Sequence, residues 1–141
     1  MLVEQLAAAG LPEYRVVAAR SATVEQKEAA RAGRFTVFGH ELELAPPIDW
    51  NQNPFGSRSG AYELHTLQLL DLLIRSYLDD DDREALVQAV AIALDWSAAN
   101  PRGGEGVSEF AWYDMAVGLR AGYLGFLARA AAEIGMDRRR E

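Results

Sequence analysis

Hydrophobic residues recur at helical spacing over most of the chain. Residues 2 to 9 form a short apolar segment followed by a glycine and a proline, which predicts a brief helix that ends there. A second helix is predicted from Thr23, because the run TVEQ is typical of a capping box in which Gln26 reaches back to the first turn. Gly33 is a suitable residue to end this helix.

Residues 34 to 44, RFTVFGHELEL, follow a different pattern. Apolar and polar positions alternate on both sides of a central glycine, which predicts a small β-hairpin. Its buried side is expected to consist of Phe35, Val37, Leu42 and Leu44. The following stretch, APPIDWNQNPFG, predicts an ordered loop.

Two long helices are predicted next, over residues 60 to 78 and 83 to 99. Leucines lie around more than half of the first helix, so we expect neighbours to cover it on two sides. The run from Asp79 to Asp82 is expected to end that helix and to cap the next one. Four adjacent aspartates are also compatible with a metal site, but a solvated turn is the favoured interpretation. The second helix is expected to end at an Asn-Pro pair.

The last predicted helix covers residues 109 to 135 and carries a stripe of small residues. Gly118, Ala121, Gly125 and Ala128 are three or four residues apart, which favours close approach by a neighbouring helix. On this interpretation, Gly125→Leu would overpack the contact. The chain is thus expected to be one mainly helical domain over residues 1–141, with N-terminal helices at 1–33, the hairpin and loop at 34–57, long helices at 58–135 and a charged tail at 136–141.

Composition narrows the classes of function. Half of the 141 residues are hydrophobic, so the chain can bury a sizeable core. The formal net charge of -7 argues against nucleic-acid binding, and the lack of cysteine excludes thiolate metal sites and disulfides. We expect no cofactor, no metal and no membrane partner. No secretion signal is visible, so a cytoplasmic location is expected if the N-terminus is the native one.

Three spaced segments resemble a known family. RFTVFGHELELAPPIDWNQNPF resembles the entry segment of the heparinase II/III type of polysaccharide lyase, and YELHTLQLLDLL resembles the helix that follows it in that family. DWSAANPRGGEGVSEFAWYDMAVGLRA resembles the next element, and all three occur in the expected order over roughly residues 29 to 130. The resemblance implies the first helical hairpins of an (α/α) toroid, the helical half of enzymes that cleave acidic polysaccharides by β-elimination.

The reaction of that family requires groups that this chain does not supply. β-Elimination needs neutralisation of the uronate carboxylate, a base for the adjacent proton and an acid for the leaving oxygen. The resemblance implies that an Asn-His pair, a Tyr and a further His fill these roles later in the toroid and in a C-terminal β-sandwich. The only histidines here are His40 and His65, and neither follows an Asn. We therefore assign no catalytic residue.

The leading hypothesis is a substrate-cleft part of a heparinase II/III-like lyase without catalysis of its own, with an acidic polysaccharide as its ligand. The alternative is a non-enzymatic helical interaction module derived from that fold. Self-association that covers exposed helix faces is compatible with both. The glycine-rich RGGEG loop lacks the preceding strand and the following Lys-Ser/Thr of a phosphate loop, so nucleotide binding is set aside.

Four residues are candidates for sugar binding. His65 either faces the cleft or is a satisfied buried histidine, and the second interpretation is favoured. Trp112 either stacks on a sugar ring or packs in the core. Tyr113 and Arg120 are seven residues apart, which places them on nearly one helix face.

Arg120 has two opposed interpretations. It either contacts a ligand carboxylate in an open cleft or braces helices through a buried ion pair. Glu63 and Asp114 are candidates to pair with Arg120 or with another arginine across a helix interface, and the sequence does not choose between these partners. The favoured interpretation is that Arg120 holds two helices together through this buried ion pair and that the Tyr113 side chain faces the cleft.

Overall fold

The computed structural model describes residues 22–135 of the chain. The predicted helix at residues 2 to 9 and the tail at 136–141 lie outside this range. Within it, the mainly helical fold with one two-stranded antiparallel hairpin is confirmed. The elements are α2 (Val24–Arg31), β1 (Arg34–Val37), β2 (His40–Glu43), α3 (Arg58–His65), the short 3-10 helix η1 (Gln68–Leu70), α4 (Asp71–Asp80), α5 (Arg83–Ala99) and α6 (Asp114–Glu133).

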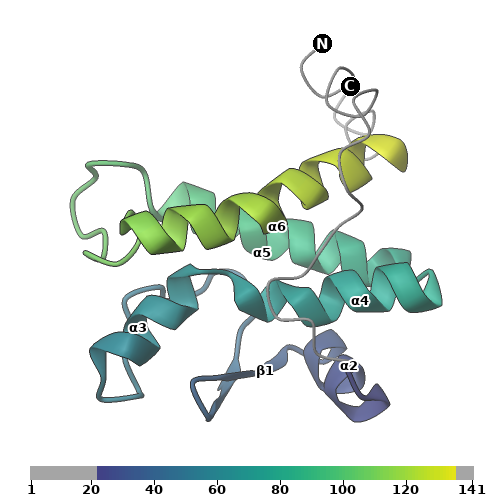
Figure 1. Cartoon of the computed structure of the whole chain (residues 1–141), viewed down its shortest axis with the longest axis horizontal. Helices are drawn as coiled ribbons and strands as arrows, with labels where there is room; N and C mark the ends of the chain where they lie inside the picture. The colour runs from purple at the N-terminus through teal and green to yellow at the C-terminus, as the bar shows by residue number, and fades with distance from the viewer. Residues whose placement is uncertain (1–21, 136–141) are drawn as a thin grey trace.

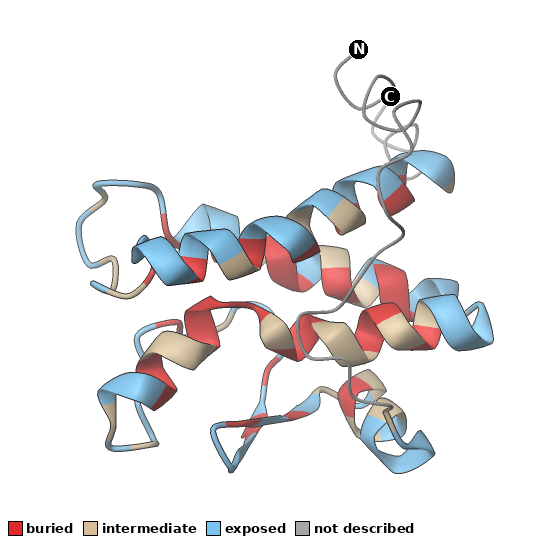
Figure 2. Ribbon diagram, viewed as in Figure 1, coloured by how far each residue is buried: buried red, intermediate tan, exposed pale blue. Residues whose placement is uncertain are grey.

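The elements are stacked in layers (Figure 1). Helices α3 and α4 lie in the middle, with α5 and α6 on one side and α2 and the hairpin on the other. Helices α4 and α5 form an antiparallel pair, and α6 runs back along α5. Buried positions line the facing sides of these layers, so a single core extends through the described part of the chain (Figure 2).

The start of α2 and the hairpin form as the sequence predicts. The Thr23 hydroxyl accepts a hydrogen bond from the Gln26 backbone at 3.1 Å, and the Gln26 side chain accepts one from the Thr23 backbone at 2.9 Å. This confirms the capping box. In the hairpin, Phe35 pairs with Leu42 across the strands. The expected apolar set, Phe35, Val37, Leu42 and Leu44, is buried, which confirms the alternating pattern.

The single helix predicted over residues 60 to 78 is wrong. The chain forms α3, then a break at Thr66 and Leu67, then η1 and α4. Leu67 has a left-handed backbone with φ 60°, and the Thr66 hydroxyl donates to the Glu63 carbonyl at 2.6 Å, which ends α3. The change of direction buries both Leu67 and Leu70 completely. The expected covering on two sides is confirmed for both pieces, because α4 packs between α5 and α2, and α3 packs between α6 and the hairpin.

The aspartate run ends α4 and caps α5, as predicted: Asp79 and Asp80 are the last residues of α4, and Asp81 and Asp82 connect the two helices. Three of its side chains form ion pairs with Lys27 and Arg31. Asp82 caps α5 by accepting a hydrogen bond from the Ala85 backbone at 3.1 Å, and it pairs with Arg31 of α2 at 2.8 Å. Asp79 and Asp80 both contact Lys27 of α2. The turn therefore ties α2 to the α4 and α5 pair.

Helix α6 differs from its prediction in two respects. It begins at Asp114 and not near residue 109, because residues 109–112 form turns and Tyr113 has an extended backbone. The small-residue stripe faces away from α5. A Cβ atom added to Gly118 or Gly125 would meet no atom within 4 Å. The predicted packing of a neighbouring helix against this stripe is therefore wrong within the described part of the chain.

Candidate functional site

Two of the four candidate residues lie in the interior. His65 is 1% exposed and Arg120 is 2% exposed. The His65 ring accepts a hydrogen bond at Nδ1 from the indole N–H of Trp96, at 3.1 Å. Because an indole nitrogen can only donate, the His65 proton is on Nε2. The favoured interpretation, a satisfied buried histidine, is confirmed.

Arg120 braces α6 against α3, but not through an ion pair. Its guanidinium donates a hydrogen bond to the His65 backbone carbonyl at 2.7 Å. Its Cζ atom lies 3.8 Å from the centre of the Trp96 ring and 5.3 Å from that of Trp112. Among residues 22–135, no carboxylate forms an ion pair with it. The predicted carboxylate partner is therefore wrong, because two indole faces and a carbonyl surround the cation instead.

The proposed partners of Arg120 have other positions. Glu63 accepts a hydrogen bond from the backbone N–H of Phe38 at the hairpin turn. Asp114 is exposed at the start of α6.

Burial shifts the ionisation of both interior residues. Removal from water lowers the pKa of His65 to about 4, and the charge of Arg120 contributes in the same direction, while a hydrogen bond to the Trp50 backbone opposes the shift. Burial lowers the pKa of Arg120 to about 10. At neutral pH, His65 is therefore uncharged and Arg120 is a cation. Neither side chain is open to a polysaccharide.

His65, Trp96 and Arg120 form one interior group. Trp112 lies at the edge of this group and is 36% exposed. Its indole N–H donates to the Asn100 backbone carbonyl at 3.0 Å, and its ring is tilted against that of Trp96 with centres 5.6 Å apart. Arg102 approaches the Trp112 ring at 5.8 Å. Trp50 and Trp96 are buried, and the Trp50 indole donates to Asp95 at 2.9 Å, which anchors the predicted loop on α5. Trp50 and Trp96 therefore belong to the core, whereas Trp112 packs at its edge with part of its ring exposed.

Tyr113 lies apart from this group and is 54% exposed. It borders a pocket of about 230 Å³, which we call the tyrosine pocket. The pocket is lined by Arg58, Ser59, Tyr62, Phe110, Tyr113 and Met115. Helix α3 supplies one wall, and the segment that leads into α6 supplies the other. The Tyr62 and Tyr113 rings meet edge to face with centres 5.9 Å apart.

The polar groups of the tyrosine pocket are suited to an anionic, hydroxyl-rich ligand. The Arg58 guanidinium lies 5.2 Å above the centre of the Phe110 ring, and its ion pair with Glu109 is long, at 3.4 Å, and exposed. Such a pair is weak, so Arg58 can exchange this partner for a ligand carboxylate. The Tyr62 hydroxyl is buried without a hydrogen-bond partner among the described residues, and burial raises the pKa of this phenol.

Sequence reasoning missed most of this pocket. It identified Tyr113 but not Arg58, Ser59 or Tyr62, because the predicted helix began at residue 60. The spacing of these three residues, i, i+1 and i+4, was a usable signal, since positions i and i+4 lie on one face of a helix. Phe110 was assigned to a helix and is part of the turn that precedes α6.

The described residues provide no centre for metal chemistry. Within residues 22–135, no three His, Cys, Asp or Glu side chains are grouped so that they would hold a metal ion. No helix in this range is both long and apolar enough to cross a membrane. Comparison with protein-family models, curated proteins and solved structures finds no match for this chain.

Proposed function

We propose that this chain is a substrate-cleft part of a heparinase II/III-like lyase that binds an acidic polysaccharide without cleaving it. The observation that supports this function best is the convergence of an exposed guanidinium and two phenols on one pocket. Arg58 supplies the charge for a uronate carboxylate, the tyrosine rings supply apolar surface, and the exposed Tyr113 supplies a hydroxyl group. The binding site is thus the tyrosine pocket, and Tyr113 is the candidate residue that belongs to it.

The roles of the other candidates change under this proposal. His65 and Arg120 are positioning residues that hold α3 against α6, the elements on either side of the pocket. Trp112 directly precedes Tyr113, and its bond to Asn100 holds that part of the chain in place. The interior group therefore supports the pocket wall and does not contact the sugar.

The test is calorimetric titration with a hexamer of galacturonate, which carries a carboxylate on every unit. Arg58→Gln should weaken binding about tenfold, since it removes a charge-assisted contact. Tyr113→Phe should weaken it less. Arg102→Gln is the matched control, because Arg102 is also exposed and stacked on an aromatic ring but lies outside the pocket. Absence of binding, or equal losses in the Arg58 and Arg102 variants, would reject the proposal.

A second candidate function, helical association with another copy of the chain, is favoured by the outward side of α5 and α6. Val87 and Leu94 of α5 and Val117 of α6 are exposed apolar side chains. Ala121 lies on the exposed side of α6. Sedimentation across a range of concentrations should then show a dimer that Ala121→Glu dissociates. A monomer at every concentration would reject this alternative.

A further inference from the structure

The hairpin, α3, α4 and α6 contribute walls to a second pocket of about 340 Å³, which we call the hairpin pocket. The apolar side chains that line it include Val37, Phe38, Leu69 and Leu72. Its acidic side chains are Glu63 and Asp71, and no lysine or arginine of residues 22–135 lines it. The hairpin pocket therefore combines apolar surface with negative charge.

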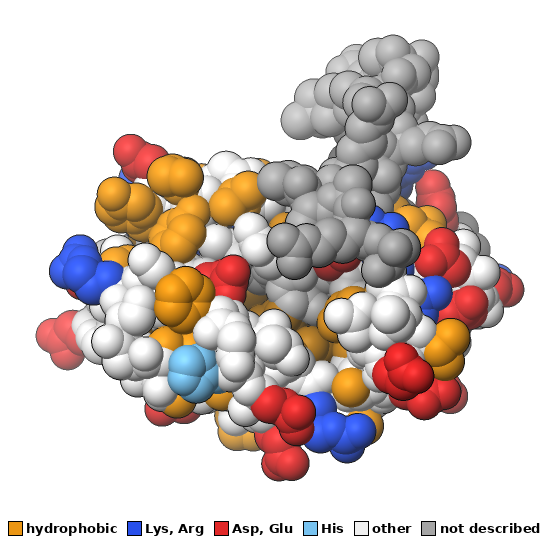
Figure 3. Space-filling view, turned by 60° about the horizontal axis from the view of Figure 1, so that its bottom comes forward, with side chains coloured by type: hydrophobic (Ala, Val, Ile, Leu, Met, Phe, Trp, Pro, Cys, Tyr) orange, Lys and Arg blue, Asp and Glu red, His pale blue; other side chains and the backbone are white. Residues whose placement is uncertain are grey.

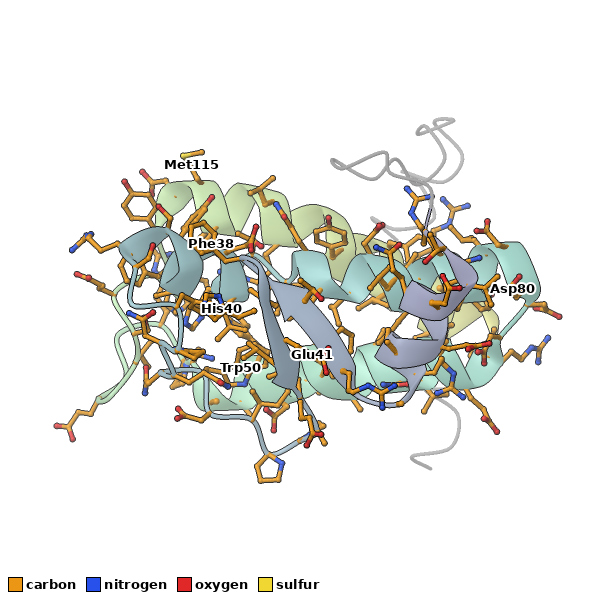
Figure 4. All side chains as sticks on the ribbon, turned by 90° about the horizontal axis from the view of Figure 1, so that it is seen from below. Phe38, His40, Glu41, Trp50, Asp80 and Met115 are labelled. Atoms are coloured by element: carbon orange, nitrogen blue, oxygen red, sulfur yellow. The ribbon has the colours of Figure 1, made fainter. Side chains whose placement is uncertain are left out.

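The Phe38 ring is an apolar wall of this pocket that the described residues leave partly open. Phe38 has a φ of 49°, at which a bulky side chain is an outlier, and it is 46% exposed. Phe55 meets its ring edge to face with centres 6.2 Å apart, and Glu63 accepts a hydrogen bond from its backbone N–H. Figure 4 shows Phe38 at the turn end of the hairpin, and Figure 3 shows hydrophobic side chains at the surface of this face. The ring is thus held in position, yet burial within residues 22–135 does not account for it.

The negative charge of the hairpin pocket is only partly neutralised. The Asp71 carboxylate pairs with Arg75 of α4 at 3.0 Å. Glu63 accepts the Phe38 N–H but forms no ion pair with a residue of the described range. A hydrogen bond from an amide leaves the net charge of a carboxylate in place. A cationic group that enters the pocket is therefore attracted to Glu63.

The chain enters its described part at this pocket, because Ala22 is the first described residue and lines it. The seven residues before Ala22 are RVVAARS, at positions 15–21. They include Arg15 and Arg20, which flank four apolar residues, and they contain no acidic residue. Seven residues span at most about 25 Å, so the attachment at Ala22 keeps the whole segment near the pocket at a high effective concentration. Its apolar and basic composition complements the apolar and acidic walls.

We propose that residues 15–21 dock in the hairpin pocket of their own chain. Val16 and Val17 cover the exposed Phe38 ring, and Arg20, two residues before Ala22, brings its positive charge toward Glu63. The hairpin pocket is then filled from within the chain and is not open to a separate ligand. The tyrosine pocket shares no lining residue with it, so this inference does not depend on the proposed function.

The experiment uses the full-length chain, which has no cysteine, so that one introduced cysteine carries a nitroxide spin label at a single site. With the label at Ala18→Cys, the NMR signals of the Val37, Phe38 and Gly39 amides should be lost, and chemical reduction of the label should restore them. Ala91→Cys is the matched control on the exposed side of α5, which lies across α3 and α4 from the hairpin. A label there should leave these three signals visible.

A charge reversal tests the recognition. Arg20→Glu in the labelled Ala18→Cys chain should restore the hairpin signals, because a carboxylate beside Glu63 is repelled. Arg138→Glu makes the same change of charge in the tail and should leave the signals suppressed. Unchanged α5 signals in both variants verify that the fold is intact.

Three outcomes would overturn the docking. The first is hairpin signals that stay visible with the label at position 18. The second is loss of these signals that persists in Arg20→Glu, because the charge would then play no part. The third comes from a mixture of labelled, unenriched Ala18→Cys with the isotope-enriched parent, in which signal loss at the hairpin would assign the occupant to a second copy of the chain.

Discussion

At the scale of single residues, Arg120 shows how surroundings decide a role. The sequence allowed a ligand contact or a buried ion pair. The structure places the guanidinium over the Trp96 ring and near the Trp112 ring, with one hydrogen bond to the His65 carbonyl. A cation in the interior is stabilised there by ring electrons and by a backbone dipole. Its loss should therefore act on stability and not directly on sugar contacts.

Arg120→Ala should lower the free energy of unfolding by about 2 to 4 kcal/mol, because it removes a desolvated cation–π contact and a charged hydrogen bond. Urea denaturation measures this change. Arg129→Ala is the matched control, since Arg129 lies on the same helix in an exposed pair with Glu133, and it should cost less than about 0.5 kcal/mol. If both variants lose a similarly small amount of unfolding free energy, Arg120 does not hold α6 against α3.

His65 should make stability depend on pH. Its pKa is about 4 in the folded protein and 6.5 in an ordinary environment, so the unfolded chain takes up the proton first as the pH falls. The free energy of unfolding should therefore decrease between pH 6.5 and pH 4, by up to about 3 kcal/mol. Urea titrations at several pH values measure the slope. His40→Asn should retain it, because the His40 side chain is exposed.

A second measurement tests the same residue in the parent protein. NMR titration of the His65 ring should show a neutral imidazole down to about pH 5, in keeping with the pKa of about 4. A ring that becomes charged near pH 6.5 would show that His65 is not buried in solution.

At the scale of elements, the sequence predicted the start of a helix correctly where a capping residue was present. The capping box of α2 and the Asp82 cap of α5 formed as the sequence indicates. The break at Leu67 did not follow from any local signal, since leucine rarely adopts a left-handed backbone. The side of α6 that meets α5 was also misassigned, because a stripe of small residues is compatible with a helix contact and with open solvent.

Gly125→Ala should raise the free energy of unfolding by about 0.5 to 1 kcal/mol, because the added methyl group meets open space and alanine favours a helix. Thermal denaturation measures the effect. Gly60→Ala is the matched control on α3, where the methyl group would collide with Phe55, and it should destabilise the protein. A lower melting temperature for Gly125→Ala would show that another molecule covers the outward side of α6.

At the scale of the whole molecule, segments far apart in the sequence build each pocket. Helix α3 and the start of α6 build the tyrosine pocket, and the hairpin, α3, α4 and α6 contribute to a second one. Neither histidine of the chain lines these pockets, since His65 is buried and His40 lies in the hairpin at β2. Under the proposed function, the chain binds its ligand without the proton transfers of β-elimination.

The chain alone should therefore not increase the ultraviolet absorbance that marks unsaturated uronate products. Heparan sulfate, alginate and other uronate polymers serve as substrates, and the assay follows absorbance over time. A protein-dependent increase that heating abolishes would contradict the prediction and would require an acid and a base within this chain.

The sequence by itself determined the helical class, the hairpin and its buried side, the α2 and α5 caps, and the burial of Trp50 and Trp96. These features depend on periodicity and on neighbouring residues, which a sequence displays directly. Tertiary structure alone decided the break between α3 and α4, the partners of Arg120, and the meeting of Arg58 and Tyr62 with Tyr113. Each of these depends on how separate helices pack, and local patterns carry no information on that packing.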